Sequence, residues 1–104
     1  NDVKGLASGA ACEALLLTAK ARILAPLVVW RRAEDDFLLL TEEELAEGVR
    51  TALRTTHNLA EGAGAAAIAA AVRMRDALNG RRVVAIMSGG NIDAATLRWV
   101  LDRP

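Results

Sequence analysis

The stretch RRVVAIMSGGN, residues 81–91, carries the strongest fold signal in the chain. Its apolar part, RVVAIM (82–87), is rich in β-branched residues and predicts a buried strand. The four residues after it, SGGN (88–91), predict a tight loop at the carboxyl end of that strand. Ligands of α/β proteins bind outside the carboxyl ends of strands, so this loop is the first candidate site.

Helices are expected on both sides of this strand and loop. The alanine-rich segment upstream favours a helix at about residues 61–78, which would let neighbouring elements approach closely. Asn79 and Gly80 are typical of a helix end. Downstream, Asp93 is positioned to cap a short last helix that continues to about residue 101.

The first half of the chain predicts two further helices and one strand. TEEE (41–44) is a capping-box pattern and starts a helix over residues 42–55. FLLL (37–40) is short, apolar and bounded by polar residues, as in a strand buried on both faces. Residues 13–24 favour a helix, and Pro26 is expected to end it. Leu27 to Trp30 is an apolar run of either type.

This order of elements predicts an α/β fold, with a partial parallel-type sheet flanked by helices. Buried strands separated by helices imply parallel pairing. Two strands supply neither the companion strands nor the covered faces that a parallel sheet needs. Residues 1–104 are therefore expected to form one piece of a larger domain.

Composition excludes several classes of function. Thirteen basic residues balance thirteen acidic ones, and only 3% of the residues are aromatic, so a nucleic-acid-binding surface is not expected. One cysteine and one histidine exclude a disulfide framework and a Cys/His zinc site, and no metal site is predicted. The longest apolar runs, 23–30 and 65–72, are far shorter than the roughly 20 residues of a membrane span. No signal-peptide pattern opens the chain, and a soluble, cytoplasmic protein is expected.

Two segments could carry a ligand. In the first, Ser88 and Asn91 offer hydrogen bonds while Gly89 and Gly90 permit close backbone approach; the alternative is a plain strand-to-helix turn. In the second, EGAGAA (61–66), the small residues could admit a cofactor. Alternatively, Glu61 only completes a capping box with the preceding Asn58.

Other reactive side chains are expected to be structural. His57 has no evident partner for general-base catalysis and is interpreted as a residue of an inter-helix loop. Cys12 is expected to be buried and inert. Lys4 and Lys20 are expected to be surface charges.

Two motifs give the chain a specific resemblance. TTHNLAEGAGAA (55–66) and RVVAIMSGGNID (82–93) closely resemble the C-terminal part of threonine/serine dehydratases, with GLASG (5–9) and residues 35–44 similar to the preceding segments. Those enzymes are pyridoxal-phosphate-dependent lyases of fold type II, the tryptophan synthase β group, which also contains serine racemase. The resemblance implies the C-terminal portion of the large domain, amino-acid metabolism, a small hydroxy-amino-acid substrate, and the remainder of the enzyme as a partner.

The resemblance also implies roles for particular residues. Ser88 matches the serine that hydrogen-bonds the pyridine nitrogen of pyridoxal phosphate, with Gly89 and Gly90 packed under the ring. Glu61 matches an acidic residue near that ring. Asn91 matches, more weakly, a position that contacts an activating nucleotide in the racemase branch.

The chain lacks several functional elements of the family. The Schiff-base lysine, the phosphate-binding loop and the substrate-carboxylate loop all lie upstream of the matching residues, and neither Lys4 nor Lys20 stands in the lysine's motif. About ten extra residues lie between Glu13 and Asp35. The chain is therefore not expected to be catalytic alone. Two alternatives are a self-associating structural module and a non-catalytic module that binds a small ligand at residues 88–91.

Overall fold

The computed structural model describes residues 5–17 and 23–104. The chain divides into two compact units, here called the N-terminal unit (Asn1–Glu42) and the C-terminal unit (Glu43–Pro104). The first is a β-sheet and the second is helical, which agrees with the α/β class expected from the sequence.

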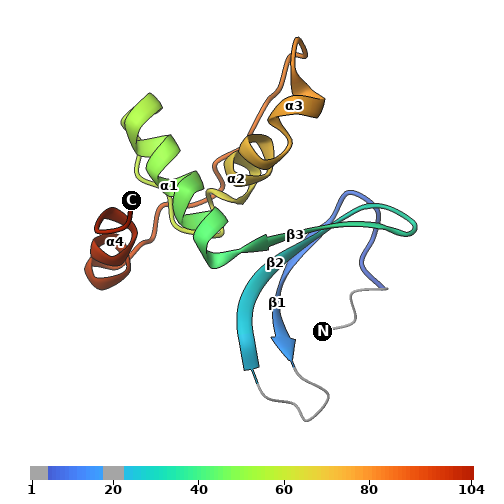
Figure 1. Cartoon of the computed structure of the whole chain (residues 1–104), viewed down its shortest axis with the longest axis horizontal. Coiled ribbons are helices and arrows are strands. Elements are labelled where there is room, and N and C mark those ends of the chain that lie inside the picture. Colours follow the sequence, from blue (N-terminus) through green and yellow to red (C-terminus); the bar gives the residue numbers. More distant parts are fainter. Residues whose placement is uncertain (1–4, 18–22) are drawn as a thin grey trace. The chain divides into compact units, whose positions relative to one another are not determined.

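The N-terminal unit is a three-stranded antiparallel sheet of order β1-β2-β3 (Figure 1). Its strands are β1 (Ala11–Leu17), β2 (Ile23–Ala33) and β3 (Asp36–Thr41). In the ladders, Ala11 pairs with Trp30 and Val28 pairs with Leu40. Residues 34 and 35 form the tight turn between β2 and β3. Antiparallel pairing follows because a connection this short can only join antiparallel neighbours.

The helix predicted over residues 13–24 is wrong where the structure describes it. Residues 13–17 and 23–24 lie in β1 and β2, and residues 18–22 fall outside the described residues. Leucine and alanine favour helix locally, but strand pairing overrides such preferences. Pro26 does not interrupt β2, because β2 pairs with β3 only from Leu27 onward. Pro26 therefore has a ladder neighbour in β1 and none in β3. Proline is tolerated at such a position, because only one side of the strand needs backbone hydrogen bonds.

The strand predicted at residues 37–40 is confirmed as part of β3, but its expected burial on both faces is wrong. Leu40 is buried, whereas Leu39 is 50% exposed. The partial parallel-type sheet expected of this chain is not confirmed, because the three strands of the described residues all pair antiparallel.

The C-terminal unit consists of four helices (Figure 1). They are α1 (Glu42–Thr56, the first residue of which belongs to the N-terminal unit), α2 (Ala66–Arg73), α3 (Arg75–Leu78) and α4 (Ala94–Leu101). The predicted helices at 42–55 and up to residue 101 are confirmed, and the Asp93 carboxylate accepts a hydrogen bond from the Thr96 N–H at 2.9 Å. The single helix predicted at 61–78 is correct only in part: residues 62–65 form a turn before it, and the remainder is divided at Met74 into α2 and α3.

Small residues build the core of the C-terminal unit. Its buried cluster comprises Ala46, Val49, Ala52, Ala60, Ala65 and Val100, with Ile68, Ile92 and Trp99 packed against it. A methyl group added at Gly48 of α1 would lie 2.9 Å from the Ala65 carbonyl oxygen and 3.1 Å from the Ala69 Cβ. The close approach expected of the alanine-rich segment is thus observed.

The strand predicted at residues 82–87 is wrong for this chain. Figure 1 shows an extended trace between α3 and α4, and Val84 in it is 89% exposed. A strand requires a neighbour with which to exchange backbone hydrogen bonds, and no described residue pairs with this segment. Within the described ranges, no helix combines the length and apolar character needed to cross a bilayer.

Candidate functional site

The structure brings together the two segments that the sequence singled out. The Glu61 N–H donates a hydrogen bond to the Gly89 carbonyl oxygen at 3.1 Å. The Gly90 carbonyl in turn accepts the N–H of Ile92 at 2.9 Å, which turns the chain toward α4. Segments 59–64 and 88–91, separated by more than twenty residues, therefore form one local site.

Glycines make this contact possible. A Cβ at Gly64 would overlap the Gly89 carbonyl oxygen, and one at Gly89 would overlap the Glu61 carboxylate. A Cβ at Gly90 would lie 2.6 Å from the Leu59 carbonyl oxygen. The glycines therefore allow segment 88–91 to pack closely against segment 59–64 of the same chain.

Glu61 does not cap a helix. α2 begins only at Ala66, its N-cap is Ala65, and that cap has no side-chain hydrogen bond. The side-chain amide of Asn58 donates to the Thr56 carbonyl at 3.1 Å. The capping-box interpretation of Asn58 and Glu61 is therefore wrong. Glu61 is half-buried, and its carboxylate lies against Gly89.

The polar groups of the loop face solvent. Ser88 and Asn91 are both exposed, while Gly89 between them is half-buried. The site thus offers three polar groups: the hydroxyl of Ser88, the side-chain amide of Asn91 and the carboxylate of Glu61. The hydroxyl can both donate and accept a hydrogen bond. Such a set can bind and orient a polar ring or a small polar ligand.

The remaining candidates are accounted for structurally. His57 is exposed at the end of α1 with φ 57°, and its N–H bonds the Leu53 carbonyl at 3.1 Å, so its interpretation as a loop residue is confirmed. Cys12 is half-buried, rather than buried as expected. Lys4 and Lys20 lie outside the described residues. Among the described residues, no three His, Cys, Asp or Glu side chains gather as they would at a metal centre.

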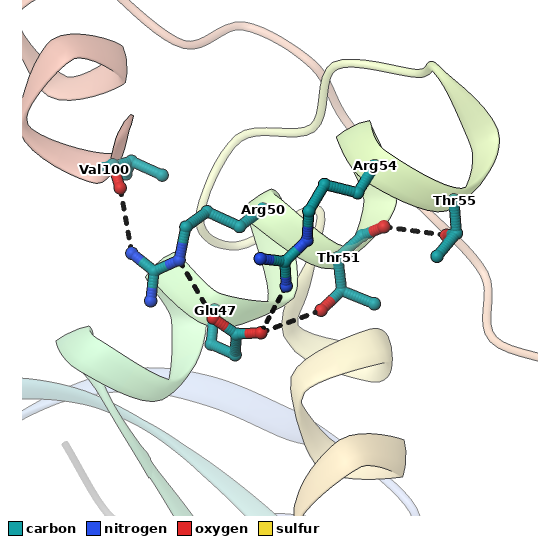
Figure 2. A network of polar contacts seen from close by, with 6 residues as sticks. All are labelled: Glu47, Arg50, Thr51, Arg54, Thr55 and Val100. Atoms are coloured by element: carbon teal, nitrogen blue, oxygen red, sulfur yellow. Dashed lines mark hydrogen bonds and ion pairs between the residues drawn. The ribbon is translucent and has the colours of Figure 1, made fainter. Parts of the chain in front are cut away.

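A polar network on α1 was not predicted from the sequence (Figure 2). The Glu47 carboxylate accepts hydrogen bonds from Arg50 at 2.9 Å and Arg54 at 2.7 Å. Arg50 also donates to the Val100 carbonyl of α4 at 2.9 Å. The spacings of three, four and seven residues from Glu47 to Arg50, Thr51 and Arg54 are the signal that could have revealed it.

Burial and the two arginines act in opposite directions on the pKa of Glu47. Partial burial raises the pKa of Glu47, but hydrogen bonds and charge from Arg50 and Arg54 outweigh it, so the pKa lies below the ordinary glutamate value. The network thereby ties α1 to the C-terminal end of α4. It supports the helix that follows the candidate loop.

Comparisons with known proteins find relatives that are named threonine ammonia-lyase or threonine dehydratase. The chain is 39% identical to the L-threonine ammonia-lyase of Geobacter sulfurreducens over 69 residues, which are 66% of this chain and 17% of that protein. The L-threonine ammonia-lyase of Thermotoga maritima is 33% identical over 69 residues, again 66% of this chain and 17% of that protein. The L-threonine dehydratase catabolic TdcB of Staphylococcus aureus is 35% identical over 71 residues, which are 65% of this chain and 20% of that protein.

These alignments also fix the extent of the relationship. The chain spans only 17–20% of the length of these curated relatives. No family model and no solved structure matches the chain significantly. About two thirds of this chain is therefore related to a segment of threonine dehydratase-like proteins.

Proposed function

We propose that this chain is the C-terminal segment of a pyridoxal-phosphate-dependent threonine/serine dehydratase, an ammonia-lyase. In this assignment its sheet and helices belong to the large domain of a fold-type II enzyme. The relatives named threonine ammonia-lyase and threonine dehydratase support it. The observation that carries the proposal is the hydrogen bond between Glu61 and Gly89, because it unites the two motifs on which the assignment depends.

The residues present suit the ring of the cofactor. Ser88 carries an exposed hydroxyl next to a loop whose backbone is held by segment 59–64. Such a hydroxyl can donate to the pyridine nitrogen, and Glu61 supplies a carboxylate beside the same loop. The phosphate-binding loop and the Schiff-base lysine would come from the remainder of the enzyme. Asn91 would contact a regulatory nucleotide, an assignment that rests on a weaker match than those of Ser88 and Glu61.

The chemistry of a hydroxyl at this position fits elimination. When bound, pyridoxal phosphate withdraws electrons from the α-carbon of an amino acid. A neutral hydroxyl leaves the ring nitrogen largely unprotonated, whereas a carboxylate would keep it protonated and strengthen electron withdrawal. The weaker withdrawal suits loss of water from a small hydroxy-amino acid. Ser88 therefore tunes the ring, and the remainder of the enzyme performs the proton transfers.

The test is Ser88→Ala in the full-length enzyme. We expect weaker cofactor binding, seen as a higher pyridoxal phosphate concentration for half-maximal activity, and a changed visible spectrum. Ser8→Ala is the matched control, because Ser8 is exposed and its hydroxyl donates a hydrogen bond to the Arg32 carbonyl, away from the candidate loop in the sequence. Unchanged affinity and spectrum in Ser88→Ala would refute the assignment of Ser88.

A further inference from the structure

Asn79 and Gly80 form an exposed turn directly after α3. Asn79 adopts φ −55° and ψ 130° and Gly80 adopts φ 74°, which are the values of a type II β-turn. The Arg81 N–H closes the turn by donating to the Leu78 carbonyl oxygen at 2.9 Å. Asn79 and Gly80 are both exposed, and α3 contains no buried residue. Core packing of α3 therefore does not restrain this turn.

Two groups of the turn are available to react with each other: the side-chain amide of Asn79 and the peptide nitrogen of Gly80. Within the described ranges, 5–17 and 23–104, neither the Asn79 side chain nor the Gly80 N–H takes part in a hydrogen bond. Because Gly80 has no Cβ, no side chain hinders access to its nitrogen. Glycine also accepts both signs of φ, which permits the rotation of the 79–80 peptide that brings this nitrogen to the side chain.

We propose that Asn79 is a site of spontaneous deamidation through a cyclic imide. The Gly80 nitrogen attacks the Asn79 Cγ, so that a bond between that nitrogen and Cγ forms and the Cγ–Nδ2 bond breaks. The proton of the Gly80 N–H passes through water to the leaving nitrogen, which departs as ammonia. Water then opens the ring at the side-chain carbonyl, giving aspartate, or at the main-chain carbonyl, giving isoaspartate. Water is the only co-reactant.

Asn58 and Asn91 are also exposed, but their surroundings do not favour this reaction. Leu59 follows Asn58 and Ile92 follows Asn91, and these branched side chains hinder access to the nitrogen that would attack. The Asn58 side-chain amide donates to the carbonyl two residues before it at 3.1 Å. The Ile92 N–H is itself bonded to a carbonyl oxygen at 2.9 Å. Exposure is therefore shared, and the residue that follows distinguishes Asn79.

The reaction would alter the connection that leads from α3 toward the candidate loop. Either product adds a carboxylate next to the exposed Arg81 and Arg82, and lowers the formal net charge of the chain by one. Isoaspartate also routes the main chain through its side-chain carbons, which lengthens the backbone just before Gly80. This proposal goes beyond the proposed function and does not depend on it.

Peptide mapping tests the proposal. The native full-length protein that carries these residues is incubated at mildly alkaline pH and physiological temperature, and is then digested with trypsin beside a sample that was not incubated. Cleavage after arginine places the three described asparagines in separate peptides, 55–73, 76–81 and 83–98. We expect peptide 76–81 to gain about 1 Da, the difference between an amide and a carboxyl group, and to contain isoaspartate as well as aspartate. The other two peptides should stay unchanged over the same period and serve as internal controls.

Asn79→Gln is the matched variant. It retains an exposed amide but needs a larger ring, which forms more slowly, so the gain in peptide 76–81 should disappear. An equal gain in this variant would overturn the proposal, and so would a product that contains aspartate without isoaspartate, because only the imide opens to both.

The same protein unfolded in urea shows whether the folded turn permits the reaction. We expect the folded protein to react within about tenfold of the unfolded rate, because an exposed turn opens at little cost in free energy. A folded rate further below the unfolded one would show that the native turn protects Asn79, and would overturn the proposal whatever Ser88→Ala does to the cofactor spectrum.

Discussion

Gly62 and Gly64 stand two residues apart, yet a methyl group added at each would meet different surroundings. At Gly64 it would overlap the Gly89 carbonyl oxygen, whereas at Gly62 it would find no atom within 4 Å. We expect Gly64→Ala to destabilise the protein by about 1–3 kcal/mol, the usual cost of overpacking. Gly62→Ala is the control and should be neutral or stabilising by up to about 1 kcal/mol. Equal urea midpoints for the two variants would contradict the contact between segments 59–64 and 88–91.

His57 gives a second prediction for a single residue. Its φ of 57° lies in the left-handed region, which glycine adopts without strain and β-branched residues adopt at a cost. We expect His57→Val to lower the free energy of unfolding by roughly 1–2 kcal/mol. His57→Gly should leave it unchanged or raise it slightly. Chemical denaturation of the three proteins measures both effects, and a valine variant as stable as the glycine variant would refute the left-handed end of α1.

At the scale of elements, α4 is stabilised at both ends. Asp93 caps its start, and Arg50 of α1 donates to the Val100 carbonyl near its end. Hydrogen bonds between the Asp93 carboxylate and the Thr96 hydroxyl and N–H hold the pKa of Asp93 below its ordinary value. These contacts fix the helix that directly follows the candidate loop.

Arg50 and Arg54 share one carboxylate partner but differ in what else they contact. Arg50 has a side chain only 11% exposed and also bonds α4, whereas Arg54 is 63% exposed and bonds Glu47. We expect Arg50→Ala to cost about 1–3 kcal/mol and Arg54→Ala less than about 1 kcal/mol. Thermal unfolding of the two variants measures the difference. A larger loss in Arg54→Ala would show that Arg50 does not tie α4 to α1.

The lowered pKa of Glu47 predicts a pH dependence of stability. A carboxylate whose folded pKa lies below its unfolded value stabilises the protein above that unfolded value, and the contribution is lost as pH falls through the folded pKa. Glu47→Gln should therefore be less stable than the parent at pH 7, and the gap should close as the pH falls below about 4.5. Glu34→Gln is the control, since Glu34 is exposed in a turn. A gap that stays constant with pH would show that the carboxylate charge does not contribute.

Local signals predicted two of the helices, α1 and α4, well. The capping pattern at Thr41 to Glu44 and the cap at Asp93 gave α1 and α4 close to their observed bounds, because each signal lies within one turn of the helix it starts. Residues 13–24 were misjudged, because their leucines and alanines favour helix while strand pairing decides the outcome. The strand at 82–87 was also misjudged for this chain, because a strand depends on neighbours that a local pattern cannot supply.

The candidate site was only partly predictable. Its two motifs could be identified from the sequence. Their proximity could not, because it depends on the fold of the C-terminal unit and not on any local pattern. The role of the glycines in packing one segment on the other became visible only with the backbone in place. The Glu47 network was missed because charged residues at helical spacing are common on solvated faces.

At the scale of the whole molecule, two observations support the proposal that the chain is part of a larger protein. The segment 82–87 exposes apolar side chains on both faces, and the curated relatives are about five times longer than the part this chain matches. The proposed binding of pyridoxal phosphate would also need the Schiff-base lysine and the phosphate-binding loop from further polypeptide. We propose on this basis that the chain is one segment of a larger pyridoxal-phosphate enzyme.

The most direct test is the intact mass and visible absorbance of the protein purified from its native source. The account predicts a mass several-fold above 11.0 kDa together with the yellow absorbance of bound pyridoxal phosphate. A colourless protein of 11.0 kDa would contradict it.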